Sequence, residues 1–190
     1  MKRETIYRLF SNIPELYTPR LFLRKMHVKD ADDMYEYAKR ADVTKFLTWN
    51  PHPNRSYTRE YLEYISTRYA VGEFFDWAVT TIDDEKMIGT CGFTRFDFNS
   101  NLGEVGYVIN PEYQGNGYAP EALEAVIKFG FGRLALRRIE ARYMEGNTAS
   151  RRVMEKVGMT YEGTLRSSLL VRGEYRDIGV CSIINYNFRS

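Results

Sequence analysis

The sequence predicts an α/β fold, with one mixed, mostly antiparallel sheet of about seven strands and helices on both faces. The chain has 190 residues, enough for one domain with a full core, so we treat 1–190 as a single domain. Short β-like runs and amphipathic helical runs follow the order β-α-α-β-β-β-α-β-α-β-β. A helix connects the strands at 104–109 and 138–143, so these two should be parallel, whereas short connections elsewhere favour antiparallel pairs.

The first third of the chain should contribute one strand and two helices. Residues 1–17 form a lead-in of unknown role, for which an N-terminal helix and an extended arm are the alternatives. Apolar and other residues alternate in a strand at 20–24. Asp30 is a suitable N-cap for the first helix, and the second helix begins at Ser56 or Thr58.

The rest of the chain alternates strands with two further helices. Pro120 lies near the start of the first of these, where the missing N–H of a proline costs nothing. Gly158 follows the second in the position that commonly ends a helix. The expected ranges are strands at 75–82, 87–96, 104–109, 138–143, 161–165 and 176–184, and helices at 120–131 and 147–157.

Composition excludes several classes of partner. The net charge is +2 and the charges are dispersed, so nothing indicates direct nucleic-acid binding. No apolar run could span a membrane and the N-terminus does not read as a signal peptide, so we expect a cytoplasmic protein without membrane contact. Cys91 and Cys181 are expected to be small buried residues in a reducing cytosol. His27 and His52 have no partners at ligand spacing, so no metal site is expected.

The segment from Gln114 to Ala119 has the features of an anion-binding loop. It lies between a strand and a helix start, where free backbone N–H groups and the helix dipole favour a phosphate. Glycines allow a close approach of the ligand to the chain. The Walker pattern fails because Tyr118 and Ala119 follow Gly117, and the dinucleotide fingerprint fails because Pro120 replaces its third glycine. A surface turn that binds nothing is the alternative.

The motif Q/R-x-x-G-x-G/A, read here as Gln114, Gly117 and Ala119, resembles the pyrophosphate-binding loop of the GNAT superfamily of acetyl-CoA-dependent N-acetyltransferases. The segment from Asn147 to Met159 resembles the second acetyl-CoA motif of that superfamily and follows the first in the expected order. Taken alone, this segment is also an ordinary capped helix with an apolar stripe.

Three further segments resemble the ribosomal-protein-alanine/serine N-acetyltransferase branch. These are Thr18–Arg24, Glu104–Tyr107 and Gly173–Asp177, and the similarity extends over residues 18–188. The resemblance implies a sheet whose fourth and fifth strands splay apart and admit the pantetheine arm of acetyl-CoA, which would hydrogen-bond to backbone near Val108 and Ile109. The resemblance also implies that the pyrophosphate lies on the N–H groups of Gly115 to Ala119. The residues implied to bind the cofactor are Val108, Ile109, Gln114, Gly115, Asn116, Gly117, Tyr118, Ala119 and Asn147.

Transfer of an acetyl group to an amine needs a base for the amine and an acid for the leaving thiolate. Glu104 is the candidate base, with an ordinary solvent-facing glutamate as the alternative. Many superfamily members use a tyrosine as the acid, but Met154 occupies the matching position here. Ser150 resembles the serine of the ribosomal branch and is the candidate acid; the alternative is a hydroxyl that bonds locally to the helix backbone.

The expected function is acetyl transfer from acetyl-CoA to a primary amine. An α-amino group has a pKa near 8 and is partly neutral in the cytosol, whereas a lysine near 10.4 is almost wholly charged. With no clear strong base, a protein N-terminal α-amine is favoured over a lysine. A small-molecule amine acceptor and a non-catalytic acetyl-CoA sensor stay open, as does a homodimer.

Overall fold

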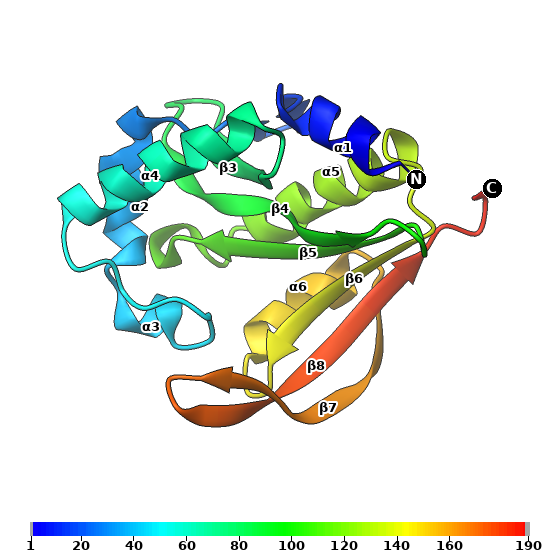
Figure 1. Ribbon diagram of the computed structural model, residues 1–190. Helices are drawn as coiled ribbons and strands as arrows, with labels where there is room; N and C mark the ends of the chain where they lie inside the picture. The colour runs from blue at the N-terminus through cyan, green and yellow to red at the C-terminus, as the bar shows by residue number, and fades with distance from the viewer. Residues whose placement is uncertain (1, 189–190) are drawn as a thin grey trace.

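The computed structural model describes residues 2–188. Within them, eight strands form one sheet in the order β1-β2-β3-β4-β5-β6-β8-β7, and only β5 and β6 pair in parallel. The sheet runs through the centre of the molecule (Figure 1). The strands are β1 Leu16–Tyr17, β2 Leu21–Arg24, β3 Phe75–Thr81, β4 Met87–Asp97, β5 Leu102–Ile109, β6 Arg138–Met144, β7 Thr160–Val171 and β8 Glu174–Ile184.

Helices cover both faces of this sheet. The α-helices are α1 Arg3–Phe10, α2 Ala31–Ala38, α3 Ala41–Thr44, α4 Arg55–Ala70, α5 Tyr118–Gly132 and α6 Thr148–Lys156, with short 3-10 turns η1 Val28–Asp30 and η2 Pro111–Tyr113. On one face, Phe10 of α1 and Phe129 of α5 pack edge-on against Trp77 of β3. On the other face α2 packs against α4, and the Tyr69 hydroxyl of α4 donates to the Asp76 carbonyl at 2.5 Å. Trp77 thus faces the α1–α5 layer, while its neighbour Asp76 lines a cavity together with residues of α2 and α4, as the alternation of side chains along a strand requires.

The predicted fold class is confirmed, with additions at the N-terminus. The lead-in supplies α1 and the two-residue strand β1, which raises the strand count to eight. Phe10 of α1 is fully buried among aromatic side chains, so this helix is part of the core. The strand β1 could not be predicted from apolar alternation, because two residues are too few to show it.

Several boundaries differ from the prediction. The helix α4 begins at Arg55, because Asn54 is the N-cap and its Oδ1 accepts the Tyr57 N–H at 2.8 Å. The strand β7 extends to Val171 instead of ending at Leu165, because its pairing with β8 resumes after an irregularity between Leu165 and Leu169. The predicted strand ended at Leu165, where this irregularity begins.

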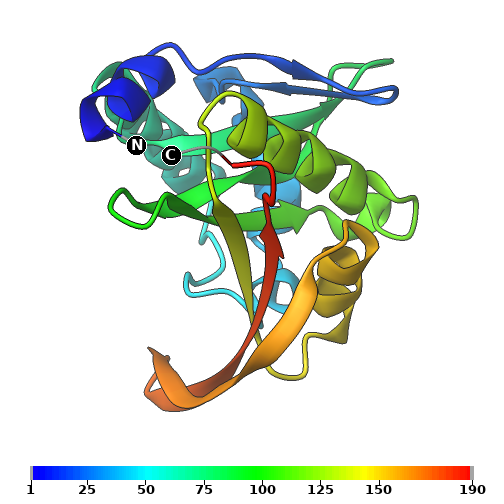
Figure 2. The ribbon, with the colours of Figure 1, turned by 90° about the vertical axis from the view of Figure 1, so that its right-hand side faces the viewer.

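The strands β5 and β6 separate along their length. They pair from Leu102 opposite Arg138 to Val105 opposite Ala141, and the remainder of each strand is unpaired with the other. Both views show the β6–β8–β7 half of the sheet diverging from the β5 half (Figures 1 and 2). The α6 helix begins beside this opening. The expected splay between the fourth and fifth predicted strands is therefore present, between β5 and β6.

Both cysteines are buried and unpaired, as expected. Burial raises the pKa of the Cys91 thiol, which keeps it protonated. Among residues 2–188, no helix has the length and apolarity needed to cross a membrane.

Candidate active site

The loop before α5 presents a row of free backbone donors. Gly115 and Gly117 both adopt φ of +82°, a left-handed conformation that other residues adopt at a cost. Among the described residues, the N–H groups from Gly115 to Ala119 have no acceptor, which is usual for a loop that leads into a first helical turn. Gln114 fixes the loop to the preceding strand, because its Nε2 donates to the Ile109 carbonyl at 2.9 Å. This arrangement suits a diphosphate.

Arg20, the residue just before strand β2, contacts the same loop. Its Nη1 donates to the Asn116 carbonyl at 2.9 Å, and its guanidinium lies 4.7 Å from the centre of the Tyr118 ring. Glu121 binds both Arg20 and Thr18. Burial opposes ionisation of Glu121, but these hydrogen bonds outweigh it and lower the pKa of its carboxyl. Arg20 is half-exposed, so the loop has a cation beside it that the motif alone did not indicate.

The start of α6 places a serine hydroxyl against a tyrosine of β5. Asn147 is the N-cap, and its Oδ1 accepts the Ser150 N–H at 3.1 Å. The Tyr107 hydroxyl lies 2.9 Å from the Ser150 Oγ and 2.8 Å from the Ser150 carbonyl oxygen. Burial raises the pKa of Tyr107 well above its usual value, which keeps its hydroxyl protonated. This pair bridges the two sides of the splay.

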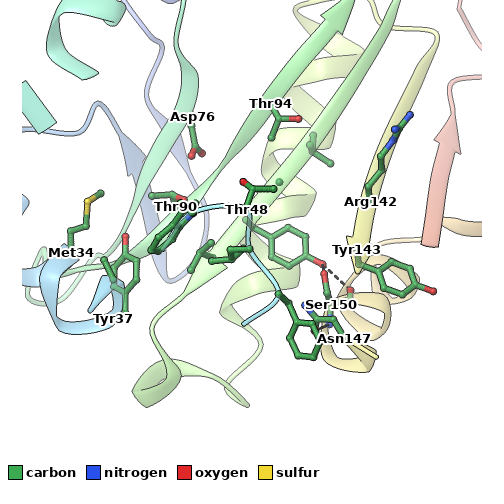
Figure 3. A pocket seen from close by; sticks show the side chains of 18 of the residues that line it. Met34, Tyr37, Thr48, Asp76, Thr90, Thr94, Arg142, Tyr143, Asn147 and Ser150 are labelled. Carbon is green, nitrogen blue, oxygen red and sulfur yellow. Dashed lines mark hydrogen bonds between the residues drawn. The ribbon is translucent and has the colours of Figure 1, made fainter. Parts of the chain in front are cut away.

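Two cavities meet at this pair. The smaller, of about 300 Å³, extends between the loop after β5 and the first turn of α6, and its walls include Gln114, Ala119 and Val153. The larger, of about 410 Å³, extends between β3, β4 and the α2–α4 layer. Figure 3 shows its two sides, with Tyr37, Asp76 and Thr90 on one and Tyr143, Asn147 and Ser150 on the other. The residues shared by both cavities are Phe46, Leu47, Tyr107, Val108, Asn147 and Ser150.

This arrangement of loop, splay and joined cavities agrees with the comparison with known families. A family model described as an acetyltransferase (GNAT) domain matches residues 20–160. The chain belongs to the GNAT acetyltransferase family. It is an N-acetyltransferase, and the resemblance drawn from its motifs is confirmed.

Similar proteins align with nearly the whole chain. An uncharacterized N-acetyltransferase, p20, of Bacillus licheniformis is 32% identical over 91% of this chain and 97% of its own length. The [ribosomal protein uS5]-alanine N-acetyltransferase of Escherichia coli is 30% identical over 88% of this chain and 90% of its own. The crystal structure of a GNAT acetyltransferase from Bacillus anthracis superposes with a TM-score of 0.80 and 31% identity, over 90% of this chain and 98% of that one.

In this GNAT acetyltransferase, Glu104 lies beside the larger cavity but not in its wall. Its Oε2 accepts from Arg95 at 2.8 Å and from Arg142 at 3.1 Å, and its Oε1 accepts from the Thr94 hydroxyl at 3.2 Å. Thr94 and Arg142 do line the cavity. The carboxylate predicted to be the base thus has its oxygens occupied by three donors, and it holds Arg142 at the edge of the site.

Asp76 of β3 is a carboxyl in the cavity wall that sequence reasoning missed. Burial raises its pKa to about 7, although a hydrogen bond from Thr90 and the Trp77 N–H, 3.0 Å from Oδ1, act in the opposite direction. An aspartate inside a strand of mixed composition gives no signal of this environment in the sequence. A carboxyl that titrates near neutral pH can exchange a proton with a bound substrate.

Loop residues 46–50 form another wall of the larger cavity, and Arg172 of the β7–β8 turn holds this loop. Its Nε donates to Asn50 Oδ1 at 2.9 Å, and its Nη2 donates to the Thr44 and Trp49 carbonyls at 3.0 and 2.8 Å. A turn arginine far along the chain from the loop could not be assigned to this role from sequence. Arg172 therefore connects the hairpin to the cavity wall.

Met154 occupies the position where many superfamily members have a tyrosine. It is buried, with 1% of its surface exposed, and lines the larger cavity. A thioether has no proton to give. The hydroxyls nearest to the junction of the two cavities are those of Ser150 and Tyr107.

Proposed function

We propose that this protein transfers the acetyl group of acetyl-CoA to a primary amine, and that the amine is a protein N-terminal α-amine. The observation that supports this most is the junction of two cavities at Ser150. One cavity leads to the loop with free N–H groups and the other to a carboxyl that titrates near neutrality. A donor and an acceptor could therefore meet at one point from opposite sides.

The residues present fit acetyl-CoA, which supplies the acetyl group as a thioester. The N–H groups of Gly115, Asn116, Gly117, Tyr118 and Ala119 would hold its diphosphate. The smaller cavity, which includes Val108, Ile109 and Asn147 in its walls, would hold the pantetheine arm. Arg20 would add a positive charge beside the diphosphate.

Ser150 is proposed as the acid that protonates the departing thiolate. The Tyr107 hydroxyl donates its proton to the Ser150 carbonyl oxygen at 2.8 Å, so the Ser150 hydroxyl, 2.9 Å away, donates to the Tyr107 oxygen. Once Ser150 has given its proton to the thiolate, the Tyr107 hydroxyl would turn its proton to the serine oxygen and stabilise the alkoxide. The high pKa of Tyr107 ensures that this proton is present at neutral pH. This pair would take the place of the tyrosine that Met154 replaces.

An α-amine acceptor is supported by size and by acid–base chemistry. A cavity of about 410 Å³ is large enough for one or two residues of a peptide end. A base with a pKa near 7 is well matched to an amine whose pKa is about 8 and poorly matched to a lysine near 10.4. The similarity to an alanine N-acetyltransferase of a ribosomal protein agrees with this acceptor class.

Transfer to a small-molecule amine is the second candidate, because a cavity of about 410 Å³ would also admit a small amine. The two are separated by measuring the thiol released from acetyl-CoA with peptides that begin with Ala or Ser, with polyamines, and with amino-sugar antibiotics. We expect the Ala and Ser peptides to stimulate release and to gain one acetyl group at the N-terminus by mass spectrometry. Stimulation of thiol release by small amines alone would identify a small-molecule acceptor, and acetyl-CoA binding without stimulation by any amine would contradict both acceptor classes.

A further inference from the structure

The side of the larger cavity away from Ser150 contains Asp76, whose protonation the proposed function invokes, and a second polar group, the Tyr37 hydroxyl, to which it gives no role. Asp76 on β3 lines the wall as a half-buried carboxyl. Tyr37 on α2 lines the same wall with 2% of its surface exposed, and its hydroxyl has no hydrogen-bond partner within residues 2–188. A buried hydroxyl without a partner costs about 1–3 kcal/mol, so it is typical of a place that a ligand completes. Figure 3 shows both side chains on the same side of the cavity.

The groups around Asp76 are neutral. Burial, and in smaller part the charge of Asp76, raises the pKa of Tyr37 on α2, of Tyr61 and Tyr69 on α4, and of Cys91 on β4. Across the described residues, no lysine, arginine or histidine forms an ion pair with Asp76. An ionised carboxylate here lacks a counter-cation, and an ammonium group is the ligand that would supply one.

The wall next to Asp76 is aromatic. Trp49, Tyr57 and Tyr61 each contact the His52 ring, with centroids 4.9–5.6 Å apart, and all four line the cavity. Burial lowers the pKa of His52, so its ring is neutral at physiological pH and does not repel a cation. Aromatic faces around one carboxylate form an environment that attracts an organic ammonium.

We propose that Asp76 binds the ammonium group of the acceptor and is the catalytic base that receives its proton, with Tyr37 and the aromatic wall selecting an amine attached to an apolar or small residue. This rests on the function proposed above and deepens it. It assigns the base to β3 rather than to Glu104 on β5, whose oxygens are occupied by Arg95, Arg142 and Thr94.

The step balances without a further reactant. The ammonium form of the acceptor gives one proton to an Asp76 oxygen on the far side of the cavity. The neutral amine then moves to the junction at Ser150, where its nitrogen lone pair attacks the thioester carbon. The C–N bond forms, the C–S bond breaks, and the thiolate takes a proton from the Ser150 hydroxyl. The acetylated nitrogen loses its extra proton to the serine oxygen, which restores the Ser150 hydroxyl. Asp76 returns its proton to solvent after the product leaves.

The test compares Asp76→Asn, Tyr37→Phe and Glu104→Gln with the wild type, using an Ala-initiated peptide as acceptor and calorimetric titration with coenzyme A. The matched control is Asp83→Asn, which changes the same charge in the exposed β3–β4 turn. We expect Asp76→Asn to lower kcat by about 100- to 10,000-fold, the usual contribution of a general base, and to leave coenzyme A affinity unchanged. The wild-type kcat should rise with pH through a value near 7, and Asp76→Asn should lose that rise. Tyr37→Phe should raise the acceptor KM, while Asp83→Asn should behave as wild type.

The outcomes separate the two proposals. Wild-type kcat and an unchanged pH profile in Asp76→Asn would overturn the role of Asp76 and leave the acetyltransferase function standing. Loss of the rising limb in Glu104→Gln, with the limb retained in Asp76→Asn, would assign the base to Glu104 instead. Failure of the wild type to bind coenzyme A or to acetylate any amine would refute the proposed function itself. Restoration of part of the activity by Asp76→Glu would support a proton-transfer role over a structural one.

Discussion

The substitution Asp76→Asn should stabilise the protein at alkaline pH while it removes activity. The folded chain holds a proton on Asp76 up to about pH 7, whereas the unfolded chain releases it near the ordinary value of 3.8. Between about pH 4 and pH 7 the folded state therefore binds more protons than the unfolded state, and the free energy of unfolding falls as pH rises. At pH 8 the wild type carries the full cost of an ionised, partly buried carboxylate. The asparagine variant carries none of that cost.

The size of the effect follows from the difference in pKa. The pKa of Asp76 rises by about three on folding, and each pKa unit corresponds to about 1.36 kcal/mol. The upper limit of the stabilisation by Asp76→Asn is therefore about 4 kcal/mol. Asp76 is partly exposed, and water screening reduces this to on the order of 2 kcal/mol. For a chain of this size, each kcal/mol raises Tm by about 2–4 °C.

The assay is urea denaturation of the wild type, Asp76→Asn and Asp83→Asn at pH 5, 6, 7 and 8, followed by tryptophan fluorescence. The advantage of Asp76→Asn over the wild type should already be present at pH 5, at about a third of its maximum, and should grow to that maximum at pH 8, with no such trend for Asp83→Asn. A difference that does not change with pH, or an asparagine variant that is less stable at pH 8, would refute the reasoning about Asp76.

Three further substitutions test other parts of the site. Ser150→Ala should lower kcat by about 100-fold or more and leave acetyl-CoA affinity nearly unchanged, measured by thiol release and calorimetry; equal turnover would exclude Ser150 as the acid. Gly117→Ala forces alanine into φ of +82°, so unfolding should become about 1–2 kcal/mol easier and coenzyme A should bind more weakly; unchanged urea midpoints would contradict the assigned geometry. Arg172→Ala removes the bonds that hold loop residues 46–50, most of which line only the larger cavity, so the acceptor KM should rise about tenfold and coenzyme A affinity should fall less. A loss of coenzyme A affinity alone would contradict the assigned role.

The fold could be predicted because its signals are local. Glycines between a strand and a helix, an asparagine before a helix and alternating apolar residues each act over a few residues, so α5, α6 and most strands were placed correctly. The strand β1 was missed because two residues carry no period. The helix α1 was left undecided because only its packing on Trp77 through Phe10 shows why it folds.

The sequence predicted only those residues of the candidate site whose positions are set by local backbone structure. Ser150 and the loop from Gln114 to Ala119 are tied to helix starts, and sequence indicates helix starts well. The partner of Ser150, Tyr107, comes from a strand 43 positions away, and its hydrogen bond exists only after the splay has formed. Asp76 acquires its perturbed pKa from helices packed against its strand, which no spacing in the sequence encodes.

The most direct test of the account is a calorimetric comparison of coenzyme A, 3′-dephospho-coenzyme A and pantetheine as ligands of the wild-type protein. If the free N–H groups from Gly115 to Ala119 hold a diphosphate, coenzyme A and its dephospho form should each bind with a stoichiometry of one, and pantetheine should bind far more weakly. Pantetheine that binds as tightly as coenzyme A, or coenzyme A that does not bind at all, would contradict the account.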